Sequence, residues 1–409
     1  MAVQVTDTAN PARQDSESLA MWLRLANTPG VGRHGASKLL QHYFSPQAVF
    51  TAANARLAAP PAQDDAAPLP LRMLSHADAG IVRAGHRPHG DDEDGISIAA
   101  ARCLAGPMPE RFRVLAQASL EWAAQSGNHL VLLGDPEYPP TLRHIADPPL
   151  LLYAKGNLAL LQCESVAVVG ARHGTAQGRS HARQFARVLS AAGMTVVSGL
   201  ALGIDAAAHE GGLEGPAGTV AVIGTGIDRI YPRRNAALAR RIAEEGCLVS
   251  EFVLGTAARA EHFPIRNRII AGMTRATLVI EAAARSGSLI TAHAAVNAGR
   301  EVFVLPGSVL SPQSVGCHVL IREGARLVAT PEHLLDDLGL AMPDQAAVPM
   351  DQAAGWLLAA LGHDPISADE LAIRLQLPPS DMQASLLALE LAGVVERLPG
   401  GVFQRLKGL

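Results

Sequence analysis

The sequence has few cysteines and no long apolar run, and both absences narrow the class of protein. Its 409 residues include only four cysteines, with no CxxC pair and no histidine at metal-ligand spacing: Cys103, Cys163, Cys247 and Cys317. Neither a disulfide framework nor a zinc site is therefore expected, and a reducing cytoplasm is the simplest location. The first residues are polar and lack the apolar core of a signal peptide, and no run of about 18 apolar residues occurs. We expect a cytoplasmic protein that does not enter a membrane.

Lysine is also scarce, and this excludes one common phosphate-binding loop. The only lysines, Lys38, Lys155 and Lys407, all stand outside any GxxxxGK[ST] sequence, so a P-loop ATPase is excluded. The segment VGARHG does not satisfy GxGxxG, because Arg172 stands where a second glycine would let the backbone approach a pyrophosphate. A phosphate held by arginine is favoured over NAD, and we expect neither a cofactor nor a bound metal.

Charge is low overall but unevenly distributed. Charged residues make up 18% of the chain and the net charge is -4, so the whole chain offers no electrostatic argument for nucleic-acid binding. Residues 166–300, however, hold 15 arginines against nine acidic residues, a local net charge of +6 that leaves -10 for the rest. We expect any anionic ligand to bind in this middle third.

The N-terminal part is predicted to be helical and interrupted. We expect a disordered tail over 1–18, then helix, turn and helix over 19–57, where PGVGRHGASKLL resembles a helix-hairpin-helix; a plain helical hairpin is an equal alternative. Residues 58–106 contain an acidic, proline-rich insertion that we expect to be mobile. A helix over 107–127 leads into the next domain.

The central part, 128–344, is predicted to be an α/β domain. Short apolar runs alternate with helical text at 129–134, 166–170, 195–199, 219–224, 247–251, 277–281 and 302–307. Near-continuous Val, Ile and Leu with intervening helices is typical of a parallel sheet that is buried on both faces. We therefore predict an extended Rossmann-like, parallel-sheet core.

The C-terminal part is predicted to be a winged helix. A linker over 345–350 precedes three helices and two short strands joined by a Pro-Gly-Gly turn, over 351–409. The segment PPSDMQASLLALELAG, which would be the recognition helix, contains no Lys or Arg. We interpret this domain as a protein-contact module rather than a reader of DNA.

Loops that follow the predicted strands carry the candidate binding residues. In an open α/β sheet, ligands bind outside the carboxyl ends of the strands. Four glycine-rich turns are expected to bring free backbone amides to this edge, together with Arg172, Arg233, Arg266, Arg268 and Phe263. Arginines and backbone amides bind the phosphates of a nucleic acid whatever its base sequence, and an aromatic ring accepts a stacked base. The combination predicts a site for single-stranded nucleic acid.

Three other polar residues have structural interpretations. Asp205 and His209 lie four residues apart on a predicted helix, and without a third ligand or a nucleophile we favour local hydrogen bonding over catalysis. Glu281, at a strand end, is the best candidate for a catalytic carboxylate, although a structural ion pair is favoured.

A series of ordered motifs resembles one family. The segments GDPEYPPTLRHIADPPLLLYAKGN, VAVVGAR, SGLALGIDAAAH, VIGTGIDRIYPRRN, FPIRNRIIAG, EAAARSGSLITAHAA and VLPGS follow one another between about Gly134 and Ala325. Together they resemble the DNA-processing protein A family (DprA, also called Smf). The resemblance implies a cytoplasmic protein, not an enzyme, that binds and protects single-stranded DNA during natural transformation and loads the RecA recombinase for homologous recombination.

The resemblance also implies a site and a quaternary structure. Arg172 and Arg233 would hold phosphates and Phe263 would stack on a base, while the GTG and RSGS turns would supply donors. The DNA-binding set is Gly170, Arg172, Gly199, Gly224, Thr225, Gly226, Arg233, Asn235, Phe263, Arg266, Asn267, Arg268, Ser286, Gly287 and Ser288. Family members form dimers through the Rossmann-like domain, so a homodimer is expected.

Two other functions remain as alternatives. A Rossmann-like enzyme that cleaves nucleoside monophosphates would use Glu281 with Arg268, but the PGGxGT-type turn of such enzymes is absent. A ligand-sensing transcription regulator would combine the core with the winged helix, but the acidic recognition helix argues against it.

Overall fold

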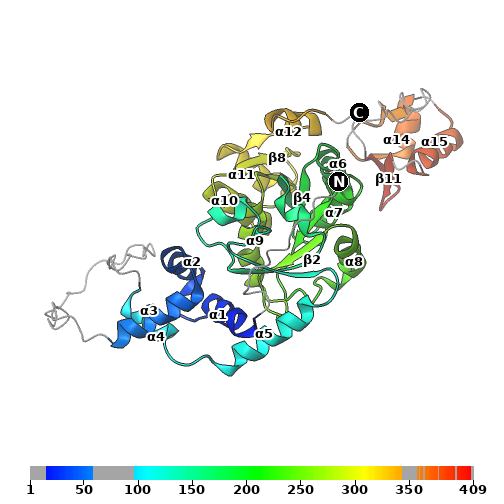
Figure 1. The fold of residues 1–409 in the computed structure, drawn as a ribbon. Coiled ribbons are helices and arrows are strands. Elements are labelled where there is room, and N and C mark those ends of the chain that lie inside the picture. Colours follow the sequence, from blue (N-terminus) through cyan, green and yellow to red (C-terminus); the bar gives the residue numbers. More distant parts are fainter. Residues whose placement is uncertain are drawn as a thin grey trace, which may run out of the picture. The chain divides into compact units, whose positions relative to one another are not determined.

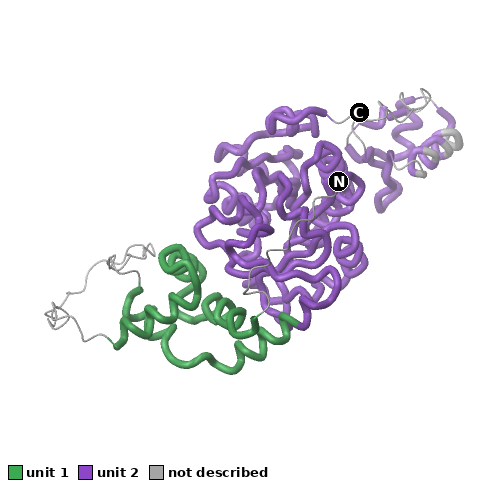
Figure 2. The backbone as a smooth tube through the Cα atoms, viewed as in Figure 1, with its two compact units in different colours: residues 1–120 green, residues 121–409 purple. Residues whose placement is uncertain are grey.

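The computed structural model describes residues 15–58, 96–342 and 357–406, except 359, 363, 376, 392 and 393. The chain divides into two compact units, Met1–Leu120 and Glu121–Leu409 (Figure 2). Most of the predicted tail, most of the predicted insertion, the linker over 345–350 and the start of the first winged-helix helix lie outside the described residues.

Helices make up the described part of the first unit. They are α1 (Ser16–Ala26), α2 (Gly32–Tyr43), α3 (Pro46–Ala58), α4 (Ile98–Leu104) and α5 (Glu110–Ala123), the last of which ends just past the unit boundary. Asp15 caps α1 by accepting hydrogen bonds from the amides of Glu17 and Ser18. Gly30 and Gly32 have φ angles of 86° and 66° at the turn before α2. The predicted succession of helix, turn and helix is confirmed by α1 and α2, whereas α3 was not predicted.

Two boundaries predicted for this unit are wrong. Residues 16–18 were assigned to the tail, but they form the first turn of α1 because Asp15 supplies the cap. Residues 98–104 were assigned to the insertion, but they form α4, where Ala101 and Leu104 are fully buried. Burial of these apolar side chains stabilises α4, although the proline-rich and acidic sequence before it does not predict a helix.

A nine-stranded sheet organises the second unit (Figure 1). Its strands are β1 (Asn128–Leu132), β2 (Leu151–Gly156), β3 (Ser165–Gly170), β4 (Thr195–Ser198), β5 (Thr219–Val222), β6 (Cys247–Ser250), β7 (Ala276–Ile280), β8 (Glu301–Val304) and β9 (Arg326–Leu327), in the order β1-β2-β6-β5-β4-β3-β7-β8-β9. Strands β3 to β9 are parallel, whereas β2 pairs antiparallel with both β1 and β6. The predicted Rossmann-like core is confirmed.

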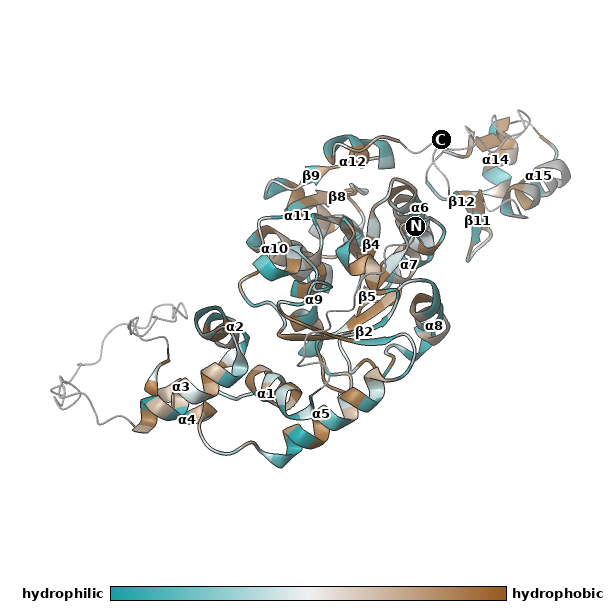
Figure 3. Cartoon of the chain, in the orientation of Figure 1, coloured by the Kyte–Doolittle hydropathy of each residue, from teal (hydrophilic) through white to brown (hydrophobic). Residues whose placement is uncertain are grey.

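Both faces of the sheet are covered, as its apolar strands require. Val166 and Val168 of β3 belong to one buried cluster, and Ala167 and Val169 belong to the other. This alternation follows from the two-residue period of a strand. Because both faces of the sheet are buried, the strand sequences are almost continuously apolar. In Figure 3 the brown of hydrophobic residues is concentrated in the sheet.

Helices from both sides supply the rest of these clusters. One face packs against α6 (Ala176–Ala191), α7 (Ile204–Leu213) and α12 (Pro331–Asp337), and the other packs against α9 (His262–Met273), α10 (Gly287–Asn297) and α11 (Val315–Arg322). Helix α8 (Ala236–Glu245) and the short 3-10 helices η2 (Thr141–His144), η3 (Leu158–Gln162), η4 (Arg233–Asn235) and η5 (Pro312–Ser314) complete the core domain. No helix in the described ranges is long and apolar enough to cross a membrane.

The described C-terminal residues form a winged helix. Strand β10 (Ile366–Ser367) precedes α14 (Ala368–Leu375) and α15 (Pro379–Leu391), and the hairpin of β11 (Val395–Leu398) and β12 (Val402–Arg405) follows. Gly400 and Gly401 have φ angles of 92° and 75° in the hairpin turn. Leu371, Leu386 and Phe403 are buried in a separate small core. The predicted arrangement is confirmed.

Candidate functional site

Strand order places the site. The chain leaves β3 toward β4 on one side and returns through β7, which leads to β8 on the other side. Loops that follow β3 and β7 therefore diverge and leave a crevice between them, the usual ligand position in an open α/β sheet.

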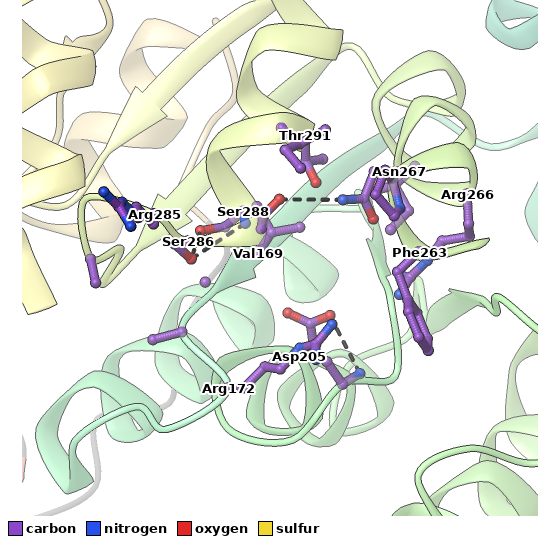
Figure 4. A pocket seen from close by; sticks show the side chains of 18 of the residues that line it. Val169, Arg172, Asp205, Phe263, Arg266, Asn267, Arg285, Ser286, Ser288 and Thr291 are labelled. Carbon is purple, nitrogen blue, oxygen red and sulfur yellow. Dashed lines mark hydrogen bonds between the residues drawn. The ribbon is translucent and has the colours of Figure 1, made fainter. Parts of the chain in front are cut away.

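Two adjoining cavities occupy this crevice, and together we call them the strand-end pocket. The larger, about 530 Å³, lies between the loop after β3, the start of α9 and the N-terminus of α10; the smaller, about 200 Å³, extends past Tyr231 and Pro232. Arg172, His173, Ala201, Phe263 and Arg266 line both cavities. Figure 4 shows Phe263, Arg266 and Asn267 projecting from α9, opposite Ser286 and Ser288 at the start of α10.

An aromatic surface forms one wall of the pocket. The Arg172 guanidinium lies 5.3 Å from the centre of the Phe263 ring, and the Tyr231 and Phe263 rings are 5.6 Å apart at 39°. Gly224 allows this packing, because a Cβ there would lie 3.1 Å from Phe263 Cδ1. Since Tyr231 is 47% exposed, the wall offers a π surface beside a cation.

A buried arginine lies behind this wall. Arg266 is only 4% exposed, and its Nε and Nη1 atoms have no hydrogen-bond partner. Burial lowers the pKa of Arg266 to about 10, Asp205 opposes this shift and Arg172 adds to it. Because this pKa stays well above 7, Arg266 remains a cation at neutral pH. Unpaired buried donors carry a free-energy cost that an anionic ligand would relieve.

The Gly199–Ala201 turn is held by three side chains, two from α7 and one from η4. Asp205 Oδ2 accepts hydrogen bonds from the amides of Gly199 at 3.1 Å and Ala201 at 3.4 Å. His209 Nε2 accepts one from the Leu200 amide at 3.2 Å, and Asn235 Nδ2 donates to the Leu200 carbonyl at 2.9 Å. The expectation that this turn offers free amides to a ligand is therefore wrong, because its own side-chain partners engage all three.

Burial explains the charge states of the two residues on α7. Burial lowers the pKa of His209 to about 3, so the imidazole is neutral at pH 7. Thr219 Oγ1 donates to the Val196 carbonyl and accepts from His209 Nδ1 at 2.8 Å, which assigns the ring proton to Nδ1. Burial raises the pKa of Asp205, and Arg266 counteracts this. Both residues form local hydrogen bonds, as the favoured interpretation of the sequence held.

The N-terminus of α10 closes the opposite end of the pocket. Ser286 caps this helix, its hydroxyl lies 2.7 Å from that of Ser288, and Asn267 Nδ2 donates to the Gly287 carbonyl at 3.3 Å. Arg285 is exposed and lines the larger cavity, although the sequence did not single it out. The sequence signal that could have identified Arg285 is its position as the first residue of the RSGS turn.

Arg268 does not reach the pocket, contrary to expectation. Its Nε lies 3.0 Å from Asp147 Oδ2 and its Nη2 lies 2.5 Å from Glu251 Oε2, so two carboxylates hold it away from the cavities. Two positions along α9 separate Arg266 from Arg268, which turns their side chains to different faces of the helix.

Five further residues of the predicted set lie around the pocket without lining it, and one of them is Gly224, the glycine beside the Phe263 ring. Thr225 Oγ1 donates to the Arg229 carbonyl, and the Gly226 amide donates to the Thr256 carbonyl. Asn235 is committed to the turn described above. Arg233 is exposed in η4 and lines neither cavity.

Glu281 has a structural position at the end of β7. Its carboxylate accepts hydrogen bonds from the amide of Thr175 at 2.8 Å and from the Thr175 hydroxyl, and Thr175 in turn caps α6. Glu281 lines neither cavity, and no ion pair with Arg268 forms. The pair that the nucleotide-cleaving alternative requires is not assembled.

The fold and the pocket define a class: a Rossmann-like binding protein that carries a cationic, aromatic cleft and a winged-helix module. A family model described as DNA recombination-mediator protein A matches residues 129–339, and one described as the DprA winged helix domain matches residues 341–401. The chain belongs to the DNA recombination-mediator protein A family, the DprA/Smf proteins. DNA processing and recombination mediation are therefore its functional class.

Individual relatives support this assignment. Protein Smf of Escherichia coli (strain K12) is 39% identical over 344 residues, which are 80% of this chain and 87% of that protein. DNA processing protein DprA of Streptococcus pneumoniae is 44% identical over 226 residues, which are 55% of this chain and 79% of that protein. The X-ray structure of the Streptococcus pneumoniae protein aligns with a TM-score of 0.53 at 41% identity, covering 60% of this chain and 84% of that one.

Proposed function

We propose that the strand-end pocket binds single-stranded DNA and that the protein hands this DNA to a RecA-type recombinase during natural transformation. The observation that carries the proposal is the buried Arg266, with two unpaired nitrogens, next to the stacked Arg172 and Phe263. A cation beside an aromatic face matches the two parts of a nucleotide, its phosphate and its base.

Each lining residue has a distinct part in this proposal. Arg172 and Arg266 hold phosphate oxygens, and Phe263 with Tyr231 stacks on a base. Arg285, Ser286 and Ser288, at the start of α10, contact the strand where it leaves the larger cavity. None of these contacts reads a base edge, so binding is expected to depend little on sequence.

The aromatic wall favours a single strand over a duplex. A base can stack on Phe263 only when it leaves the stack of its neighbours, and a paired base must also break its hydrogen bonds. Single strands avoid most of this cost. Loading of RecA and a place in transformation are proposed from membership of the family, and binding rather than catalysis is proposed as the role of the pocket.

A homodimer through the Rossmann-like domain is part of the proposal. Exposed apolar side chains occur after β8, on α11 and on the edge strand β9: Val309 is 81% exposed, Leu310 is 89% exposed, and Val319 and Leu327 are half-exposed. Exposed apolar surface of this kind marks a contact site. Two copies would give one strand two pockets and raise the effective affinity.

Fluorescence anisotropy with labelled oligonucleotides tests the DNA-binding proposal. The full chain is expected to bind a single-stranded oligonucleotide more tightly than the matched duplex. Arg172→Ala and Phe263→Ala are each expected to cost about 1–3 kcal/mol of binding free energy. Arg187→Ala is the matched control, because it removes the same charge from an exposed position on α6 that lines neither cavity. Equal effects of Arg172→Ala and Arg187→Ala would overturn the assigned pocket.

A further inference from the structure

The Gly199–Ala201 turn adopts a conformation that needs outside support. Leu200 has a φ of 56°, although it carries a branched side chain that is fully buried. The left-handed region costs an L-residue about 1–2 kcal/mol. Such a turn persists only where its surroundings fix it.

Arg266 depends on this turn for its position. A Cβ on Gly199 would lie 1.6 Å from Arg266 Nη1, so the guanidinium packs directly on bare backbone. Nη1 and Nε have no hydrogen-bond partner that would fix them otherwise. A small movement of the turn would therefore either leave the guanidinium without its packing partner or push it out of its present position.

Asp205 is an unexpected residue in a pocket for an anion. Among the described residues that line the two cavities, it is the only acidic one. A carboxylate there repels phosphate, so its charge does not favour the ligand. Its contribution is its oxygen, which accepts hydrogen bonds from the amides on either side of Leu200.

We propose that Asp205 is a positioning residue, which holds the Gly199–Ala201 turn against Arg266 and thereby keeps this guanidinium directed at the bound strand. The inference rests on the proposed function of the pocket. His209 accepts from the Leu200 amide, and Asn235 donates to the carbonyls of Leu200 and Ala201. Of these three side chains, Asp205 is the one that bridges Gly199 and Ala201.

A double-mutant cycle on the full chain tests this inference. Asp205→Ala and Arg266→Ala are each expected to weaken binding of a labelled oligo-dT by about tenfold. The two changes together should weaken it no more than Arg266→Ala alone, because Asp205 acts through Arg266. Asp205→Ala should also lower the slope of log Kd against log salt by about 0.7, the loss of one phosphate contact.

A second variant separates positioning from a purely structural role. D205N keeps an acceptor oxygen at the same place, so its Kd for oligo-dT is expected to lie within about threefold of the wild-type value. This variant also tests the inference if the Asp205→Ala chain does not fold. Additive losses in the cycle, an unchanged Kd for a folded Asp205→Ala chain, or a D205N chain as weak as Asp205→Ala would overturn the inference. In those cases Arg172→Ala would still weaken binding. Absence of binding by the wild type would instead overturn the proposed function, and the inference with it.

Discussion

At the scale of single residues, the position of Arg266 is set by what Gly199 lacks. The guanidinium occupies the space that any other side chain would fill, so the charge that we assign to phosphate binding depends on a missing Cβ. The sequence predicts both residues in the pocket but not their contact, because the 66 positions between them carry no signal of pairing.

Gly199→Ala is therefore expected to disable the pocket without changing its charge. The new Cβ would displace Arg266 Nη1, and oligo-dT affinity should fall about tenfold or more while the fold persists. Gly35→Ala is the matched control, because its Cβ would only contact a Val31 carbon at 3.4 Å. An anisotropy titration in which both variants bind like the wild type would contradict the placement of Arg266.

Burial of His209 predicts that the stability of the fold depends on pH. Its pKa is lowered to about 3 in the folded chain, against about 6.5 when unfolded, so between these values the unfolded state binds more protons. Stability should therefore fall as pH drops below about 6.5, by up to about 1.4 kcal/mol per pH unit. The measurement is urea unfolding of wild type and His209→Gln from pH 7 to about pH 4. The stability advantage of the wild type should shrink over this range, and a constant difference would refute the buried neutral imidazole.

At the scale of elements, helix α6 is joined to the end of β7 through Thr175, the residue that caps the helix. Thr175 caps α6 by accepting from the Gly178 amide at 2.9 Å, and Glu281 accepts from Thr175. Glu281 has a φ of 53°, so the strand end is turned toward the helix at some conformational cost. This junction fixes the far side of the loop that carries Arg172.

Thr175→Ala is expected to destabilise the chain by about 1–2 kcal/mol, because it removes a cap and a partner of Glu281 together. Thr330→Ala at the start of α12 removes a cap without such a partner and should cost less, about 0.5–1 kcal/mol. Chemical denaturation monitored by circular dichroism compares the two. Equal losses would show that the Glu281 contact adds nothing.

Elements with strong periodicity were predictable, and the exceptions have physical reasons. All seven apolar runs predicted as strands form strands. They were recognisable because a strand buried on both faces of a sheet has an almost continuously apolar sequence. Strand β9 was missed because its two residues are exposed, and β2 because a proline-rich segment precedes it. Arg268 was misplaced because spacing does not reveal which face of α9 meets Asp147 and Glu251.

For the chain as a whole, the exposed apolar side chains after β8, on α11 and on β9 are proposed to form a dimer contact. Leu310→Asp is expected to shift the chain from dimer to monomer, since a buried unpaired carboxylate opposes association. Ile373→Asp, at a 79% exposed position of the winged helix, should leave the mass unchanged. Light scattering coupled to size exclusion measures both. A wild-type monomer, or a Leu310→Asp dimer, would contradict the proposed contact surface.

Single-stranded DNA is proposed to occupy the strand-end pocket with a base on Phe263. Photo-crosslinking the full chain to an oligonucleotide that contains 5-iododeoxyuridine, followed by mass spectrometric mapping, tests it directly. We predict that the principal crosslink falls on Phe263 or Tyr231 and disappears when excess unlabelled single strand competes. Crosslinks confined to the winged helix or to the first unit, with none in the pocket, would contradict the account.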